Sequence, residues 1–302
     1  MVTLNNPLVS VVVNCFNGEK YLKQALQSIL NQTYKNWEVI FWDNKSTDNS
    51  KKILSEFYDK RFKYFISDKH TSLYEARDNA IRESKGEMIA FLDTDDWWNE
   101  NKLEKQVLLF DDEQVGLVYS NLYLFYENSK KKKIYSNNIL KSGYFTKELF
   151  KDYKVGISTI LLRKIAYNTV SGFNKDYNII GDFDLVVRLS LKWKFHCSQD
   201  PLIYYRIHDN NFSFTNSHLE IKEFEKWISS NEIISNKNLK PYLGYISRRI
   251  IFLKTIKDIN DGKLIKAIKK IFFLPFGFSK IKLMLYVILP RKFLKKLKKF
   301  HF

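Results

Sequence analysis

The sequence predicts a doubly wound α/β fold, in which strands and helices alternate around a mostly parallel sheet. Residues 8–13, 37–42 and 88–92 are apolar runs with the length of buried strands. A polar loop follows each run, and after the first two a helical pattern begins. Ligands of such sheets bind beyond the carboxyl ends of the strands, so these loops are the expected site.

The other elements continue this alternation. The first helix has its apolar positions between Leu22 and Leu30. Further helices are expected near Asn49, at 73–84, from Trp98 and from Asp182. Further strands are expected at 62–66, 115–121, 157–162 and 201–208, with a hairpin or surface loop that includes 130–133.

Three polar loops follow predicted strands, at 14–18, 43–48 and 93–96. The third holds Asp93, Asp95 and Asp96, whose carboxylates repel one another unless something positive lies between them. A divalent cation held by oxygen ligands is one explanation. The alternative is that Asp95 or Asp96 only caps the helix expected from Trp98. Three polar loops at one sheet edge favour a site.

The chain has 302 residues and a formal net charge of +17. Residues 237–302 hold 18 Lys and Arg and only two acids, so the basicity belongs to the C-terminal part. We expect one domain over 1–214 and a basic helical region over 215–302, with helices at 219–234, 242–256 and 263–272. No nucleic-acid-binding module accompanies the charge, so nucleic acid is not the expected partner.

The end of the chain, RKFLKKLKKFHF, places apolar residues among six basic ones. Such a helix is typical of the surface of an anionic membrane. The apolar run at 271–289 contains Pro275 and two lysines and would span a bilayer poorly. The alternative is that the basic end packs on the domain or on a second subunit, as in a homodimer.

Cys15 and Cys197 lie in apolar surroundings without metal-type spacing, which predicts reduced core residues. The N-terminus lacks the pattern of a secretion signal. We therefore expect a cytoplasmic protein that is peripheral on the inner face of the cell membrane.

Four segments, in order, resemble family 2 glycosyltransferases over about residues 8–214. The first, VSVVVNCFNGEKYLKQALQSILNQTYKNWEVIFWDNKSTDNS, is similar to the family's opening strand, helix and DDGSTD-type loop. EARDNAI and KGEMIAFLDTDDWW resemble the ARNxG and aspartate motifs. The acceptor-side segment is TILLRKIAYNTVSGFNKDYNIIGDFDLVVRL, and the closing one is PLIYYRIHDNNFS.

This resemblance implies a GT-A fold, Rossmann-like and mostly parallel, and inverting transfer of a sugar from a nucleotide donor, usually a UDP-sugar, to an acceptor hydroxyl. It implies Mn²⁺ or Mg²⁺ as the cofactor. It makes Asp182 the general base and Asp96 a supporting residue. The implied metal ligands are Asp93, Asp95 and His208. The implied donor-binding residues are Asn14, Phe16, Asn17, Asp43, Arg77, Asp93, Thr94 and Arg206, with Arg206 and His208 near the leaving group.

Each role has a structural alternative on the sequence alone. Asp43 could make only a turn, and Asp182 could only cap its helix. Arg77 could be a solvated helix charge and His208 a structural histidine.

The chain also departs from the family pattern at four positions. Asn14 replaces a common proline, Lys45 a small residue, Asp78 an asparagine and Gly181 an acidic residue. Lys45 puts nucleotide preference in doubt, and Gly181 the strength of the base.

The favoured function is a glycosyltransferase that extends a glycan, lipid-linked or on the cell surface. Two other classes remain open at this point. One is a non-catalytic sugar-nucleotide-binding or scaffold protein on the same fold, suggested by Gly181 and Lys45. The other is a nucleotidyltransferase, which also places carboxylates and a metal beside a nucleotide.

Overall fold

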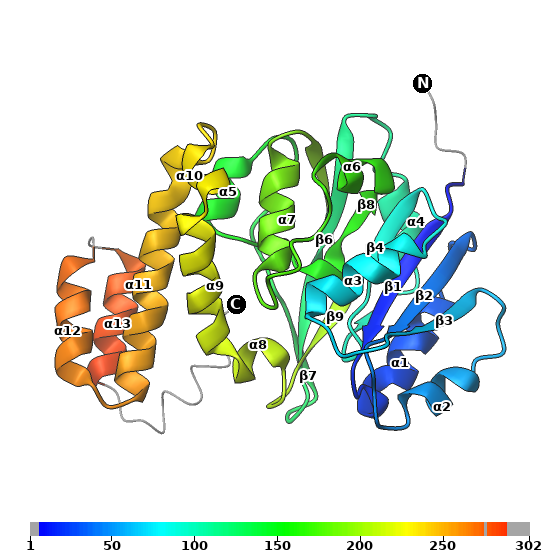
Figure 1. The fold of residues 1–302 in the computed structure, drawn as a ribbon, viewed down its shortest axis with the longest axis horizontal. Coiled ribbons are helices and arrows are strands. Elements are labelled where there is room, and N and C mark those ends of the chain that lie inside the picture. The colour runs from blue at the N-terminus through cyan, green and yellow to red at the C-terminus, as the bar shows by residue number, and fades with distance from the viewer. Residues whose placement is uncertain (1–5, 275–276, 289–302) are drawn as a thin grey trace. The chain divides into compact units, whose positions relative to one another are not determined.

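The computed structural model describes residues 6–274 and 277–288, which form two compact units that meet in sequence at Asn211 and Phe212. The first unit is an α/β domain built on a large mixed sheet (Figure 1). Its strand order is β3-β2-β1-β4-β8-β6-β9-β5, and β7 pairs with β6. The second unit is helical.

The elements of the first unit alternate along the chain as the sequence predicts. The strands are β1 (Val9–Cys15), β2 (Trp37–Asp43), β3 (Phe62–Ile66), β4 (Met88–Phe91), β5 (Trp97–Trp98), β6 (Val115–Tyr126), β7 (Lys131–Ile134), β8 (Leu161–Arg163) and β9 (Lys194–Ile207). The helices are α1 (Glu19–Leu30), α2 (Ser50–Ser55), α3 (Leu73–Arg82), α4 (Lys102–Val107), α5 (Thr146–Lys151), the short 3₁₀ helix η1 (Ile157–Thr159), α6 (Lys164–Thr169) and α7 (Gly181–Ser190).

The sheet is parallel where the three polar loops emerge. β1 lies between β2 and β4 and runs parallel to both, and β2 is parallel to β3. β8 then pairs antiparallel with β4 and β6, and β6 runs parallel to β9. β2 and β3 extend the sheet from one edge of β1, and β4 is added at its other edge. The strand order therefore reverses between β1 and β4, and ligands of open α/β sheets bind at the carboxyl ends of strands at such a switch point.

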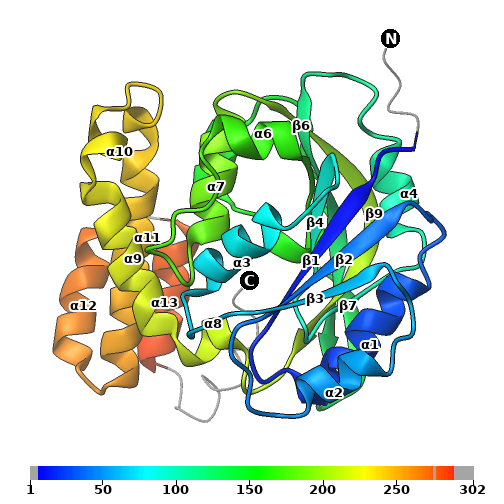
Figure 2. The same cartoon turned by 45° about the vertical axis from the view of Figure 1, so that its right-hand side comes forward.

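Helices cover both faces of this sheet, which explains the continuous apolar strands. Figure 2 shows α1 and α2 on one side, and α3, α6 and α7 on the other. One core cluster joins alternate residues of β1, such as Val9, Val11 and Val13, to apolar residues of α1. On the other side Phe91 of β4 contacts Phe173, which also packs against Tyr74 of α3.

Two predicted elements of this unit are wrong. No helix follows from Trp98: Trp97 and Trp98 form β5, which pairs antiparallel with Tyr204 and Ile203 of β9, and the helix begins at Lys102. The strand expected at 157–162 is mostly η1, and only Leu161–Arg163 joins the sheet. Asp95 and Asp96 therefore do not cap a helix.

The second unit contains α8 (Phe212–Thr215), α9 (Ser217–Ser229), α10 (Asn231–Ser235), η2 (Lys240–Tyr242), α11 (Leu243–Asn260), α12 (Leu264–Phe273) and α13 (Phe278–Ile288). The helix expected over 219–234 is two helices, because the backbone of Ser230 is extended. Gly262 separates α11 from α12 with a φ of 77°, as a helix-ending glycine does. A small core of α11, α12 and α13 side chains holds this end together. The basic segment RKFLKKLKKFHF lies outside the described residues.

Candidate functional site

The loops after β1 and β2 are bonded to each other at the parallel edge of the sheet. The side-chain oxygen Oδ1 of Asn17 accepts a hydrogen bond from the main-chain N–H of Thr47 at 2.8 Å, and the main-chain N–H of Asn17 donates to Ser46 Oγ at 3.0 Å. Asn17 has a φ of 53°, a left-handed conformation that asparagine tolerates better than most residues. One asparagine thus holds two of the three polar loops together.

Asp43 lies buried at the end of β2. Its Oδ1 accepts the amide N–H of Ser46 at 2.7 Å, and its Oδ2 accepts the hydroxyl of Tyr64 at 2.9 Å. The turn bond proposed as the structural alternative is therefore present. Lys45 within this turn has a φ of 72°, which explains why a small residue is usual there.

Asn14 and Phe16 flank the carboxyl end of β1. Asn14 Oδ1 is buried and accepts no hydrogen bond within the described residues, so it is an acceptor without a partner. Phe16 is half exposed and packs against the ring of His70 at 4.3 Å between centroids. A Cβ added at Gly18 would lie 3.0 Å from Thr94 Oγ1, so the loop after β1 closely approaches the loop after β4.

Arg77 of α3 is buried and forms an ion pair with Asp93 Oδ1. The structure therefore excludes the alternative that Arg77 is a solvated helix charge. Its second terminal nitrogen, NH1, is buried and has no hydrogen-bond partner among the described residues. A buried guanidinium N–H without an acceptor is costly and is satisfied well by an anionic ligand.

Asp95 meets His208 across the site. The two atoms Asp95 Oδ2 and His208 Nε2 are 3.0 Å apart. The main-chain amide of His208 donates to Asn211 Oδ1 at 2.7 Å, which fixes the segment after β9. Asp95 and His208 are thus a carboxylate and an imidazole that face each other from two loops.

Arg206, on β9, holds the loop that follows β4. Its Nε donates to the main-chain oxygen of Asp95 at 2.8 Å, and its guanidinium lies over the rings of Tyr21 and Trp97. Its NH2 also donates to Gln24 Oε1 at 2.5 Å. Tyr21 and Gln24 belong to α1 and carry no motif, so the sequence pattern does not connect them with Arg206.

Asp96 is buried and bonded to two other segments. It accepts the main-chain N–H of Arg206 at 2.9 Å and the hydroxyl of Ser158 at 3.1 Å. Burial, together with the charges of Asp95 and Asp93, raises the pKa of Asp96 well above its usual range. Asp96 therefore ties the loop to β9 and η1.

Asp182 lies in the first turn of α7, next to Gly181, which packs on the ring of Tyr74. The residue that caps this helix is Ile180, and no side chain caps it, so Asp182 is not the helix cap of the structural alternative. Burial raises the pKa of Asp182 to about 6, against the lowering effects of the Phe183 amide, the Arg77 charge and a hydrogen bond from Tyr74. A carboxylate with this pKa is poised to accept a proton near neutral pH.

Tyr74, which the sequence analysis also missed, fills the space beside Gly181. A Cβ added at Gly181 would lie only 2.3 Å from Cδ2 of Tyr74, so the ring occupies the place of any larger side chain there. The family pattern leads us to expect an acidic side chain at position 181; here the residue is glycine, and the buried ring of Tyr74 occupies the space of that side chain.

Asp78, the fourth departure, accepts the hydroxyl of Tyr167 at 2.8 Å and pairs with Arg82 at 2.9 Å. Both partners lie outside the set of predicted site residues. These bonds give Asp78 a structural role that links α3 to α6.

Two of the predicted metal ligands lie close enough together to share a divalent cation. Asp95 and His208 offer one carboxylate and one imidazole within reach of a single ion, and both suit Mn²⁺. Asp93, the third predicted ligand, pairs with Arg77 instead. Within residues 6–274 and 277–288 no group of three or more acidic, His or Cys side chains is arranged as a complete metal site. Nucleotide-bound cations usually take one or two carboxylates and complete their shell with phosphate oxygens, so these residues fit such an ion.

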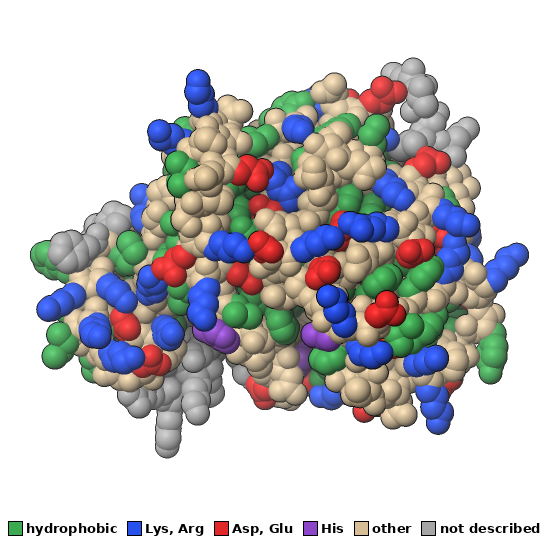
Figure 3. Space-filling view, in the orientation of Figure 1, with side chains coloured by type: hydrophobic (Ala, Val, Ile, Leu, Met, Phe, Trp, Pro, Cys, Tyr) green, Lys and Arg blue, Asp and Glu red, His purple; other side chains and the backbone are tan. Residues whose placement is uncertain are grey.

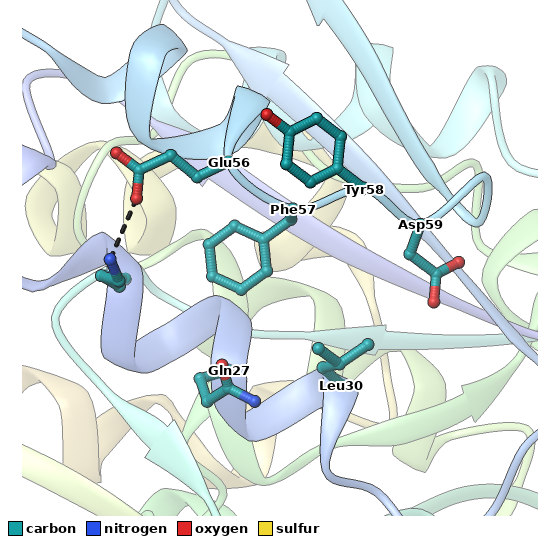
Figure 4. Close-up of a pocket in the computed structure, with 7 residues that line it drawn as sticks. Gln27, Leu30, Glu56, Phe57, Tyr58 and Asp59 are labelled. Carbon is teal, nitrogen blue, oxygen red and sulfur yellow. Dashed lines mark hydrogen bonds and ion pairs between the residues drawn. The ribbon is translucent and has the colours of Figure 1, made fainter.

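A separate depression of about 310 Å³ lies between α1 and the segment that follows α2 (Figure 4). It is lined by Lys23, Gln27, Leu30, Glu56, Phe57, Tyr58 and Asp59. Its one ion pair, Lys23 with Glu56 at 2.9 Å, is exposed. None of the predicted site residues lines it.

Comparisons with known proteins agree with this geometry. The family described as "Glycosyl transferase family 2" matches residues 10–169. The chain belongs to glycosyl transferase family 2. It is 28% identical over 269 residues to the UDP-Glc:alpha-D-GlcNAc-diphosphoundecaprenol beta-1,3-glucosyltransferase WfgD of Escherichia coli. The alignment covers 86% of this chain and 100% of WfgD.

Two solved structures of similar fold show the same architecture. The mannosyltransferase PcManGT from Pyrobaculum calidifontis, in complex with GDP-Man and Mn²⁺, superposes with a TM-score of 0.63 at 14% identity. The superposition covers 98% of this chain and 85% of the PcManGT chain. S. aureus TarS 1-349, in complex with UDP-GlcNAc, superposes with a TM-score of 0.60 at 14% identity, and the superposition covers 87% of this chain and 88% of the TarS chain. The predicted GT-A fold with C-terminal helices is confirmed, and so is the prediction of a glycosyltransferase.

Proposed function

We propose that this family 2 glycosyltransferase transfers a sugar from a UDP-sugar to a hydroxyl of a lipid-linked glycan, with inversion at the anomeric carbon and with a bound divalent cation. The observation that carries the proposal is the position of Asp182. Asp182 follows Gly181, which packs on the ring of Tyr74, and the Arg77 guanidinium lies 5.0 Å from the centre of the same ring. Burial raises the pKa of the Asp182 carboxyl to about 6. A proton acceptor thus lies beside groups suited to a nucleoside diphosphate.

On this proposal the donor lies over the carboxyl ends of β1, β2 and β4. Asp43 and the loop from Asn14 to Asn17 would line the nucleotide pocket. Asn14 Oδ1 and Arg77 NH1 support this, because neither has a hydrogen-bond partner in the described part of the chain and a nucleotide or phosphate can provide one. Phe16, exposed beside the same loop, offers an apolar face to the base.

Asp95 and His208 would hold the cation, and the diphosphate would complete its ligand shell. Bound there, the cation would neutralise charge on the departing nucleoside diphosphate. The Mn²⁺ in the complex of PcManGT supports this use of a metal in a protein of similar fold. Arg206 and Asp96 hold the main chain of the loop that carries Asp95 and so orient it.

Asp182 would take the proton of the acceptor hydroxyl as that oxygen attacks the anomeric carbon. A hydroxyl is a weak nucleophile, so a positioned base lowers the barrier. One displacement from the face opposite the leaving group inverts the configuration. The contact between Gly181 and Tyr74 would position this base.

The acceptor class is suggested by the relatives. WfgD carries a diphosphoundecaprenol acceptor in its name, and it aligns over its full length with this chain. A lipid-linked acceptor also agrees with the basic C-terminal region and with a location at the inner membrane surface. No helix among the described residues has the length and apolar character to cross a membrane.

The experiment is a panel of UDP- and GDP-sugars with Mn²⁺, scored by release of nucleoside diphosphate in the presence of a lipid-linked glycan acceptor. We expect one UDP-sugar to be used far faster than the others. Release of pyrophosphate would indicate a nucleotidyltransferase instead. Binding of a donor without turnover under every condition would indicate the non-catalytic alternative.

A further inference from the structure

α12 is apolar over a wider arc than its neighbours cover. Ala267 and Ile271 are buried in the small core shared with α11 and α13. Ile265 and Phe272, on an adjacent arc at 100° per residue, remain 74% and 77% exposed. Leu264 and Ile268 lie on the same exposed arc. An isolated exposed apolar residue is ordinary, but four on one side of a ten-residue helix form a stripe.

α13 repeats this arrangement. Leu283 and Tyr286 are buried in the same core. Four apolar residues at i, i+3, i+4 and i+7 are exposed, and the last of them is 78% exposed. These residues are Ile281, Met284, Leu285 and Ile288. α13 therefore also has an apolar arc that the described residues of its unit leave exposed.

α12 and α13 carry lysines and no acidic residue of their own. The sequence from 262 to 288 holds six lysines and no Asp or Glu. Lys266 and Lys269 of α12 have no ion-pair partner among the described residues, whereas Lys270 pairs with Asp258 at 2.5 Å. Figure 3 shows Lys and Arg side chains gathered over α12. Long lysine side chains keep their charge at a polar surface while their stems cover apolar area.

We propose that the exposed arcs of α12 and α13 bind the surface of an anionic bilayer, with the apolar side chains at the headgroup boundary and the lysines on lipid phosphates. An apolar stripe bordered by lysines is the pattern of an interfacial helix. At 10 and 11 residues, both helices are too short to span a bilayer, which requires about 20 residues. This inference rests on the proposed lipid-linked acceptor for its purpose and adds the surface that carries the binding.

The test is co-sedimentation of the full chain with vesicles of phosphatidylglycerol and phosphatidylcholine in equal parts, and with phosphatidylcholine alone. The test variant is Ile265→Glu with Phe272→Glu. The matched control is Leu108→Glu with Ile139→Glu, which changes the same charge at two exposed apolar residues of the first unit. Circular dichroism and thermal unfolding verify that each variant folds.

We expect the wild type to bind the anionic vesicles strongly and phosphatidylcholine weakly. The test variant should bind anionic vesicles about tenfold or more weakly, while the control should stay close to the wild type. Equal binding by both variants would overturn the proposal, because the charge elsewhere in the chain would then be sufficient. A wild-type dimer that the test variant dissociates, without vesicle binding, would also overturn it and assign the surface to a second copy. The assay needs no donor, so its failure is distinct from failure of the proposed transfer.

Discussion

Gly181 packs directly against the ring of Tyr74, so closely that an added Cβ would lie 2.3 Å from the ring carbon Cδ2. This contact joins the start of α7 to α3 immediately before Asp182. It also accounts for the departure from the family pattern at position 181, because an acidic side chain and this tyrosine ring would occupy the same space. The two residues therefore act as a pair that sets the position of Asp182.

Replacing Gly181 by alanine should displace the ring or α7. We expect loss of about 1–3 kcal/mol in the free energy of unfolding, as overpacking of a core produces, and a larger fall in kcat than in donor affinity. The control is Gly156→Ala, where the nearest atom would be 3.8 Å away. Combining Gly181→Ala with Tyr74→Ala should restore part of the activity. Unchanged kinetics for Gly181→Ala would contradict the pairing.

Tyr74→Phe should shift the pH dependence of the rate. The hydrogen bond from Tyr74 lowers the pKa of Asp182, so its removal should raise that pKa above about 6. A general base acts only when deprotonated, so the acid limb of the kcat/KM profile should move to higher pH and the rate at pH 6 should fall. The rate at pH 8 should change much less. An acid limb that stays in place would show that Tyr74 does not influence the base.

The metal prediction concerns Asp95 and His208. Treatment with EDTA should abolish transfer, and added Mn²⁺ should restore it. His208→Ala should raise the Mn²⁺ concentration needed for half the maximal rate by about tenfold or more. The control is the same change at His196, which lies within β9: His196→Ala. Full activity in EDTA would show that the reaction needs no metal.

Much of the fold follows from local pattern. The strand runs, the polar loops and the helix after each predict the parallel part of the sheet, and these predictions are confirmed. β5 could not be predicted in this way. Trp97 and Trp98 become a strand only because they pair with Tyr204 and Ile203, more than a hundred residues later. Pairing of this kind leaves no periodicity in a two-residue segment.

The site was predicted where one residue type carries a recognisable chemistry, as with the aspartates after β4. Tyr74 was missed because its role depends on the absence of a side chain at Gly181, which no local pattern reveals. The partners of Arg206 were missed for the same reason: Gln24 and Tyr21 meet it only after the sheet brings β9 to α1. The site roles themselves stay predictions.

Lys102 offers a test of stability that is independent of activity. Its side chain is fully buried, lies over Trp98 and donates a hydrogen bond to Gln106 Oε1 at 2.6 Å. Burial lowers its pKa well below 10.5. The unfolded chain binds this proton at higher pH than the folded chain does. Stability therefore falls as the pH falls from 10.5 toward the lowered pKa.

Lys102→Met should remove this penalty. We expect its melting temperature at pH 7 to rise by a few degrees, for a gain of about 1 kcal/mol. Its stability should also depend less on pH between 7 and 10 than that of the wild type. A melting temperature that falls, with an unchanged pH slope, would show that the charged lysine is stabilised in the fold.

The central claim is that Asp182 is the base of a transferase whose donor site lies at the strand ends. Its most direct test compares the wild type with Asp182→Asn, using the donor that the panel identifies, and measures both donor binding by calorimetry and release of nucleoside diphosphate. We predict binding within a few-fold of the wild type and a turnover that is about 10²–10⁴-fold lower, the usual contribution of a general base. Turnover by Asp182→Asn at the wild-type rate would contradict the account.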